Sequence, residues 1–272
     1  LGGIGVGCPG LVDRAAGVVR WLPNLAGGWR GVELASRLAD ELAAPAYLMN
    51  DVRLAALGEL RHGFGQQRRG ASFVLVTLGT GVGGAVVVEG SLRLGFADAA
   101  GELGHLPIDP GGARCGCGQR GCLETVASAP ALVGEATRML LSGQSPGLAE
   151  ELERRGRGET GADPGAGVDV EAIAAAAAAG DDAMGRCLDR CAEALATGLA
   201  QTVLLLMPDA ILLGGGVAGI GEPLRARVER QLRARVTMVP VEQIEILLAP
   251  LGGRAGVLGG VALAAAGGEV RR

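Results

Sequence analysis

The sequence contains no lysine: all 25 residues in the combined Lys and Arg count are arginine. A P-loop NTPase needs a lysine that reaches the nucleotide phosphates, and a Schiff-base enzyme needs a lysine amine, so both classes are excluded. Aromatic residues are scarce as well, with three Phe, two Trp and one Tyr. Stacking on aromatic rings is therefore not the main means of holding a ligand, and hydrogen bonds must do most of the selection.

Long apolar runs and a basic charge balance are also missing. No apolar run is long enough to span a membrane: the run that ends at Met207, for example, is cut by Pro208-Asp209, and we expect no signal peptide. A net charge of -4 provides no general attraction for nucleic acid, although 225–235 is locally rich in arginine. We expect no membrane partner, and a nucleic-acid partner only if a DNA-binding segment precedes this sequence.

Glycine is abundant, with 49 residues, but it shows no three-residue period. The glycines cluster between apolar runs and so mark turns, while a hydrophobic content of 49% in 272 residues is ample for a sizeable core. Strands alternating with helices, together with a glycine hairpin, predict an α/β fold with more than one sheet. The expected strands begin at Ile4 and then cover 46–49, 73–78, 85–88, 210–213 and 244–247. The expected helices cover 32–42, a short piece (148–155) of the surface connection 143–168, 170–206 with a break at 180–182, and 222–235.

The most specific motif is a histidine followed by a glycine-rich cysteine knuckle. Its members are His105, Cys115, Cys117 and Cys122. One imidazole and three thiolates complete a tetrahedral zinc shell with no open position, which is typical of a structural site. A disulfide pair with one free thiol is the alternative. Cysteines spaced as metal ligands, rather than paired as disulfides, also favour a reducing, cytoplasmic location. The other cysteines, Cys8, Cys187 and Cys191, are expected to be core thiols.

Two glycine loops follow predicted strands. The first, with Gly79, Gly81 and Gly84, matches GxGxxG, but a strand comes next, whereas a dinucleotide-binding loop must open a helix. Such a hairpin can present backbone N–H groups to a phosphate, with Thr80 adding a hydroxyl, or it is a plain turn. The second loop, 214–219, precedes a helix, so a nucleotide could approach its backbone closely. Two separated glycine loops indicate a nucleotide held across a cleft.

Polar side chains accompany these loops. Asn50-Asp51 ends a predicted strand, and Glu102 and Glu124 bracket the cysteine knuckle. A carboxylate at a strand end can accept a proton from a substrate hydroxyl, and neighbouring acids and amides can bind a polyol. Isolated Asp and Glu are usually solvated, and spacing alone leaves both interpretations open.

Taken together, these motifs resemble the ROK family of repressors, open reading frames and sugar kinases. The matching segments, in family order, are 5–10, 50–51 with 55–59, 78–84, 101–105, 115–124 and 213–218. The resemblance implies an actin-like ATPase, or ribonuclease H-like, fold with two α/β domains around a cleft. The expected domains are 1–68, with 255–272 packing back on it, and 69–254, with the zinc knuckle at 105–122. It also implies a homo-oligomer, a dimer or tetramer.

The resemblance assigns roles by position. Asp51 corresponds to the catalytic base, and the sugar contacts correspond to Asn24, Asn50, Glu102, His105 and Glu124. His105 would place one ring nitrogen on zinc and the other toward the sugar. The residues expected near Mg-ATP are Gly79, Thr80, Gly81, Gly83, Gly214, Gly215 and Gly216.

Two departures from the family pattern stand out. The family's phosphate loop, Asp-x-Gly-Gly-Thr, is absent from the sequence; its place is before Leu1, so we expect N-terminal strands to be missing and this chain alone to be inactive. Arg53 stands where the family commonly has a small or amide residue.

The resemblance favours an ATP-dependent, glucokinase-like kinase acting on a hexose or amino sugar. The loop 214–218 and the region 143–182 resemble the kinases, whereas 123–130 resembles the family's sugar-sensing transcription regulators. A regulator whose DNA-binding domain precedes this sequence is the alternative, and a nucleotide-binding scaffold without catalysis is a third.

Overall fold

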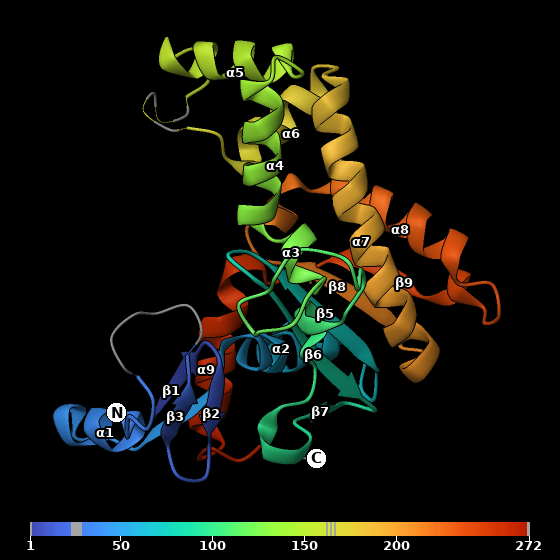
Figure 1. Ribbon diagram of the computed structural model, residues 1–272. Coiled ribbons are helices and arrows are strands. Elements are labelled where there is room, and N and C mark those ends of the chain that lie inside the picture. Colours follow the sequence, from blue (N-terminus) through green and yellow to red (C-terminus); the bar gives the residue numbers. More distant parts are fainter. Residues whose placement is uncertain (1, 23–28, 162, 164, 166, 271–272) are drawn as a thin grey trace.

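A computed structural model describes residues 2–22, 29–161, 163, 165 and 167–270. Within them the chain forms an α/β structure with one five-stranded sheet and two two-stranded sheets (Figure 1). The large sheet has the order β7-β6-β5-β8-β9. Its strands are β5 (Phe73–Leu78), β6 (Val82–Val88), β7 (Ser91–Arg93), β8 (Ala210–Gly214) and β9 (Glu245–Leu248). The pairs β5–β6 and β6–β7 are antiparallel, whereas β8 runs parallel to both β5 and β9.

The N-terminal strands form the two smaller sheets. In one, β1 (Ile4–Cys8) pairs in parallel with β4 (Ala46–Asn50), and in the other, β2 (Leu11–Asp13) and β3 (Val18–Trp21) form a hairpin. Helix α1 (Leu34–Leu42) precedes β4, as the apolar period of 32–42 predicts.

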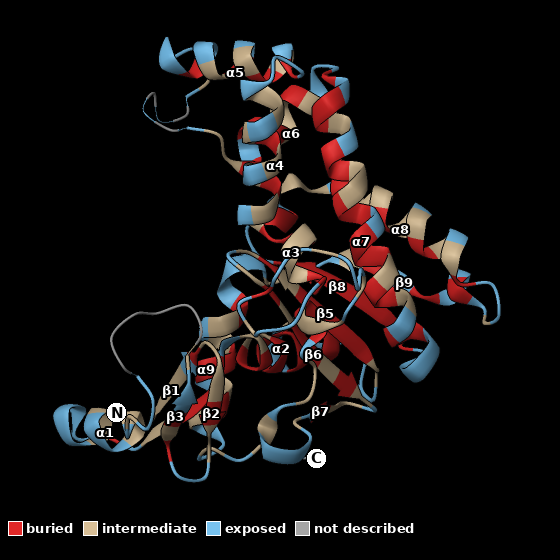
Figure 2. Cartoon of the chain, in the orientation of Figure 1, coloured by how far each residue is buried: buried red, intermediate tan, exposed pale blue. Residues whose placement is uncertain are grey.

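Side chains of β5 alternate between two cores on opposite faces of the large sheet, as the two-residue period of a strand requires. Phe73 and Leu75 pack with α2 (Asp51–His62) and α9 (Ala255–Ala265), while Val74 and Val76 pack beneath the C-terminal helical layer. Figure 2 shows these strands as a buried layer. Helix α2 therefore lies against the large sheet and joins it to the N-terminal strands.

Helices α2 and α9 approach each other closely through glycine. A Cβ atom on Gly58 would overlap the backbone oxygen of Ala255, and one on Gly259 would overlap that of Leu54. Helix α9 also packs on β1, where Gly5 lies against Gly260. Small residues here let three backbones pack with little space between them.

The C-terminal helical layer covers the other face of the large sheet and extends beyond it (Figure 1). Its helices are α3 (Glu124–Ala127), α4 (Ala129–Leu141), α5 (Pro146–Gly156), α6 (Val170–Ala178), α7 (Asp182–Leu206) and α8 (Glu222–Arg235). The predicted break at 180–182 is confirmed, because Asp181 caps α7 by accepting from the N–H groups of Ala183 and Met184. Short 3-10 helices lie at 64–66, 96–98, 103–105, 217–220, 241–243 and 252–254.

Two local expectations differ from the structure. Strand β6 begins at Val82 rather than Ala85, because Leu78 pairs with Val82 and leaves only 79–81 for the turn. Helices α2, α3, α4 and α9 were not predicted. Helix α2 opens with a polar dipeptide, and α3 directly follows the knuckle. Cys187 and Cys191 are buried in the core as expected.

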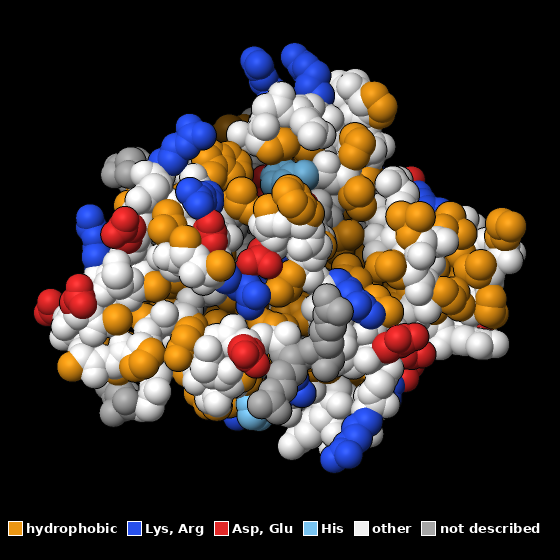
Figure 3. All heavy atoms as spheres, turned by 90° about the horizontal axis from the view of Figure 1, so that it is seen from below, with side chains coloured by type: hydrophobic (Ala, Val, Ile, Leu, Met, Phe, Trp, Pro, Cys, Tyr) orange, Lys and Arg blue, Asp and Glu red, His pale blue; other side chains and the backbone are white. Residues whose placement is uncertain are grey.

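The charged surface is mixed in sign. Figure 3 shows arginine and acidic side chains interspersed over one face, with apolar side chains between them. The arginine-rich helix α8 is largely neutralised by ion pairs: Arg225 with Glu222 and Glu229, Arg227 with Asp189, Arg233 with Glu229, and Arg235 with Glu193. Among the described residues, none of the helices combines the length and apolar character needed to cross a bilayer.

Candidate functional site

Asp51 is the first residue of α2, directly after the buried strand β4. Asn50 caps this helix: its Oδ1 accepts from the N–H groups of Val52 and Arg53, and its Nδ2 donates to the Gly10 oxygen at 3.1 Å. The cap fixes where the helix starts and so fixes the Asp51 side chain. Because the Asn50 amide makes these three hydrogen bonds to the backbone, only one of its N–H groups remains for a ligand.

The Asp51 carboxyl reaches solvent, yet protein surrounds much of it. Desolvation raises its pKa, the charge of Glu102 raises it further, and Arg53 and backbone hydrogen bonds lower it. Cys8 lies opposite Asn50 in the β1–β4 register, and burial together with the charge of Asp51 raises the pKa of its thiol. A carboxylate with a raised pKa at a helix N-terminus suits a group that takes up a proton.

Glu102 lies opposite this helix, just before the short helix 103–105 that carries His105. Its Oε1 accepts from Nη2 of Arg53 at 2.7 Å, and its side chain is 50% exposed. Arg53 is itself fully buried. The structure thus brings Asp51, Arg53 and Glu102 together, although they come from two segments about fifty positions apart in sequence.

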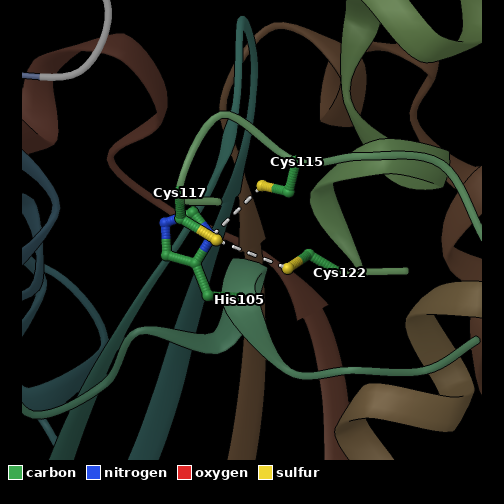
Figure 4. Close-up of side chains that lie close together, drawn as sticks. All are labelled: His105, Cys115, Cys117 and Cys122. Carbon is green, nitrogen blue, oxygen red and sulfur yellow. Dashed lines mark hydrogen bonds between the residues drawn. The ribbon is translucent and has the colours of Figure 1, made fainter. Parts of the chain in front are cut away.

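The four predicted metal ligands converge (Figure 4). Their ligand atoms all lie within 4.8 Å of one another. Sγ of Cys117 is 3.7 Å from Sγ of Cys122, and Nδ1 of His105 is 3.6 Å from Sγ of Cys115. Sulfurs on a tetrahedral zinc with bonds of about 2.3 Å are about 3.8 Å apart, whereas a disulfide is about 2.05 Å long. The residues therefore fit a closed zinc site and are not disulfide-bonded.

Glu124 connects this knuckle to the first glycine loop. It is the first residue of α3; its Oε2 accepts from the N–H of Val82 at 3.0 Å, and its Oε1 lies 3.6 Å from Sγ of Cys115. A Cβ atom on Gly81 would overlap Oε2 of Glu124, so a larger residue at that position of the turn would displace the carboxylate.

Parallel pairing brings the two glycine loops together. Strands β5 and β8 are neighbours, with Thr77 opposite Gly214, so the loops after them leave from the same edge of the sheet. Gly215, at a φ of 85°, passes so close to the backbone of Leu78 that a Cβ atom would overlap it. The turn 79–81 and the loop 214–216 are therefore adjacent.

A cavity of about 580 Å³ opens beside the second loop. It is lined mainly by glycine and apolar side chains, including Thr77, Gly214, Gly215, Gly216, Leu248, Gly252 and Ala55. This volume is typical of small-molecule sites. Ala55 is four residues after Asp51 on α2, about 6 Å along the helix axis. One helix therefore carries the Asp51 carboxylate at its start and part of the cavity wall one turn later.

A buried carboxylate connects the same helix to a segment beside the cavity. Glu59 of α2 accepts from the N–H groups of Leu251 and Phe64, and burial raises its pKa. Leu251 precedes Gly252 in the cavity lining.

Of two other predicted residues, one lies away from the turn and one is not described. Gly83 is inside β6, where the space of a side chain is taken by Val52 of α2, so it faces the helix rather than the turn. Asn24 lies outside the described residues.

Two residues at this site were not predicted to belong to it. Arg53 was noted only as a departure from a family pattern. Cys8 was predicted to be a core thiol, and it is buried as predicted. Parallel pairing of β1 with β4 would have placed Cys8 beside Asn50, but nothing in the sequence indicates the partners of Arg53.

Comparisons with known proteins agree with this arrangement. A sequence model of the ROK family matches residues 1–266. A glucokinase from Halalkalibacterium halodurans is 34% identical over 259 residues, which cover 95% of this chain and 74% of the relative. A xylose repressor from Caldicellulosiruptor bescii is 28% identical over 96% of this chain and 62% of the relative.

Among solved structures, a ROK family glucokinase from Streptomyces griseus in complex with glucose and AMPPNP superposes with a TM-score of 0.82 at 33% identity, covering 96% of this chain and 81% of that one. The predicted α/β, actin-like ATPase fold is confirmed.

Proposed function

Because this chain belongs to the ROK family, we propose that its full-length protein is an ATP-dependent sugar kinase that phosphorylates a hexose, as a glucokinase does. The main support is the position of α2, which connects the polar residues around Asp51 with the cavity beside the second glycine loop. The helix starts at Asp51, opposite Glu102, and its residue Ala55 lines the 580 Å³ cavity beside the second glycine loop. A proton acceptor and a nucleotide-sized cavity thus share one rigid element.

In this proposal Asp51 is the general base. As the sugar hydroxyl oxygen attacks the γ-phosphorus of ATP, Asp51 takes the hydroxyl proton, and the bond from that phosphorus to the ADP oxygen breaks. The backbone N–H groups of the turn 79–81 and the loop 214–216 would hold the phosphates, with Mg²⁺ neutralising their charge. Such a reaction needs mainly positioning and electrostatic stabilisation.

The sugar would be held by hydrogen bonds from side chains around Asp51. The proposed contacts are Asn24, Asn50, Glu102, His105 and Glu124. A structural zinc on His105 and the three knuckle cysteines would orient the imidazole. Only the second Nδ2 hydrogen of Asn50 is left for this role, since its other amide groups bind backbone.

The direct test is sugar-dependent ATP consumption by the full-length protein. Asp51→Asn should lower kcat by about 10²- to 10⁴-fold while sugar affinity, measured by calorimetry, stays nearly unchanged. Asp40→Asn, at an exposed position of α1, is the matched control.

The xylose repressor among the relatives gives the alternative its support. A full-length protein that binds sugar without consuming ATP, and binds operator DNA through an N-terminal extension, is a sugar-sensing regulator instead. Failure to bind any hexose or amino sugar would reject both functions.

A further inference from the structure

An arginine is buried in the first turn of α2, two residues after Asp51. Arg53 is 1% exposed and is among the largest fully buried side chains. Nε and Nη2 both donate to the backbone oxygen of Ala100, at 3.0 and 2.6 Å, and Nη2 also donates to Oε1 of Glu102 at 2.7 Å. A guanidinium removed from water is costly unless its charge and its donors are matched, and here both partners belong to one short loop.

That loop is held from its other side by backbone packing. A Cβ atom on Gly84 would overlap the oxygen of Gly101, and Gly101 has a φ of 91°, a region that favours glycine. The backbone of the loop is thus confined between strand β6 and Arg53. Glu102 is the member whose side chain reaches outward, at 50% exposure.

The arrangement determines what Glu102 can offer to a ligand. Its Oε1 accepts from the buried guanidinium of Arg53, and this charge-assisted hydrogen bond fixes the orientation of the carboxylate. An ionised carboxylate only accepts hydrogen bonds, so the remaining oxygen selects for a hydroxyl or amide hydrogen on the ligand.

We propose that Arg53 is a positioning residue for sugar binding, which holds Glu102 as an oriented, accept-only carboxylate opposite Asp51. This inference rests on the proposed sugar-binding function. It assigns to Arg53 a role exerted through Glu102, without contact between Arg53 and the sugar.

The charge of Arg53 also affects the pKa of Asp51. The charged and titratable groups that act on the Asp51 carboxyl are Cys8 from β1, Arg53 from α2 and Glu102 from the loop. Arg53 lowers the pKa of Asp51 and Glu102 raises it. Removing the arginine leaves two carboxylates without their shared cation, so the Asp51 pKa should rise and the acid limb of kcat/KM should move to higher pH.

The experiment is a double-mutant cycle in the full-length protein with Arg53→Met, Glu102→Gln and the pair together. Each single change should raise the sugar KM by about 10- to 100-fold, with the KM for ATP within about twofold of wild type. The double variant should be no worse than the poorer single variant, because Arg53 acts through Glu102. Arg53→Lys, which keeps the charge, should recover part of the loss.

Arg61→Gln, at an exposed position on the last turn of the same helix, is the matched control. Additive effects, or an equal rise in the KM for ATP, would overturn the inference, as would Arg53 variants that all melt below the assay temperature. If the wild type binds sugar without turnover, calorimetric Kd values replace KM in the same cycle. A wild type that binds no sugar rejects the proposed function itself, whereas sugar binding with an additive cycle rejects only the role of Arg53.

Discussion

Oε2 of Glu124 accepts the backbone N–H of Val82 at 3.0 Å, across 42 positions of sequence. The other oxygen of the same carboxylate faces Sγ of Cys115. One side chain therefore joins the turn 79–81, the first residue of α3 and the cysteine knuckle. A disturbance at any of these three points should reach the other two.

Gly81→Ala tests this junction. The added Cβ would overlap Oε2 of Glu124, so the carboxylate must move and the hydrogen bond to Val82 must lengthen or break. We expect kcat/KM to fall by about 10- to 100-fold through misplacement of the turn. Overpacking should also reduce the free energy of unfolding by about 1–3 kcal/mol, measured by urea denaturation.

Gly134→Ala is the matched control for that change, because a Cβ atom there meets nothing within 4 Å in helix α4. It should leave the kinetics unchanged and stabilise the helix by up to about 1 kcal/mol. Wild-type kinetics for the Gly81 variant would show that the turn does not depend on Glu124.

Zinc should be present at one ion per chain in freshly purified protein, measured by elemental analysis. The geometry of His105 with the three knuckle cysteines fits a closed tetrahedral shell. Cys117→Ser should abolish stoichiometric zinc, lower the melting temperature by on the order of 10 °C, and weaken sugar binding through His105. Cys191→Ala, at a buried core position of α7, should keep its zinc. Protein without zinc that melts and binds sugar normally would disprove the site.

Local sequence signals were enough to predict the main strands and the members of the Cys/His cluster. The continuous apolar, β-branched run 73–78 predicted β5, and the Gly180-Asp181-Asp182 signal predicted the start of α7. The knuckle is local in sequence apart from His105, so residue type and spacing sufficed to name its members. In each case the determining contacts are near in sequence or repeat with a regular period.

The parts that escaped prediction depend on tertiary packing. Gly83 matched a loop pattern but lies in β6, because Val52 of α2 occupies the space beside it. Arg53 stood out in the sequence only as a departure from the family pattern, and only the fold brings Ala100 and Glu102 to it. A glycine pattern or a single charged residue in the sequence does not indicate which distant segment of the chain that residue will contact in the fold.

The raised pKa of Asp51 predicts opposite effects on activity and stability. As a general base Asp51 must be ionised, so kcat/KM should fall on the acid side through an apparent pKa above the ordinary aspartate value of about 3.9. A carboxyl whose pKa is higher in the folded than in the unfolded state binds a proton more tightly when folded, so its contribution to stability improves as pH falls and is lost as pH rises through the folded pKa.

Asp51→Asn should therefore raise the melting temperature at neutral pH while it abolishes most turnover, and the difference in melting temperature should vanish in acid, where wild-type Asp51 is protonated. The Asn side chain keeps an oxygen that can accept from the N–H of Val52, as Oδ1 of Asp51 does at 3.0 Å, so the start of α2 is preserved. The measurements are a pH series of kcat/KM on the wild type and thermal melts of both proteins across the same range. Asp40→Asn should change neither curve. A lower melting temperature for Asp51→Asn at neutral pH, or an acid limb at or below the ordinary aspartate value, would mean that desolvation does not dominate this carboxyl.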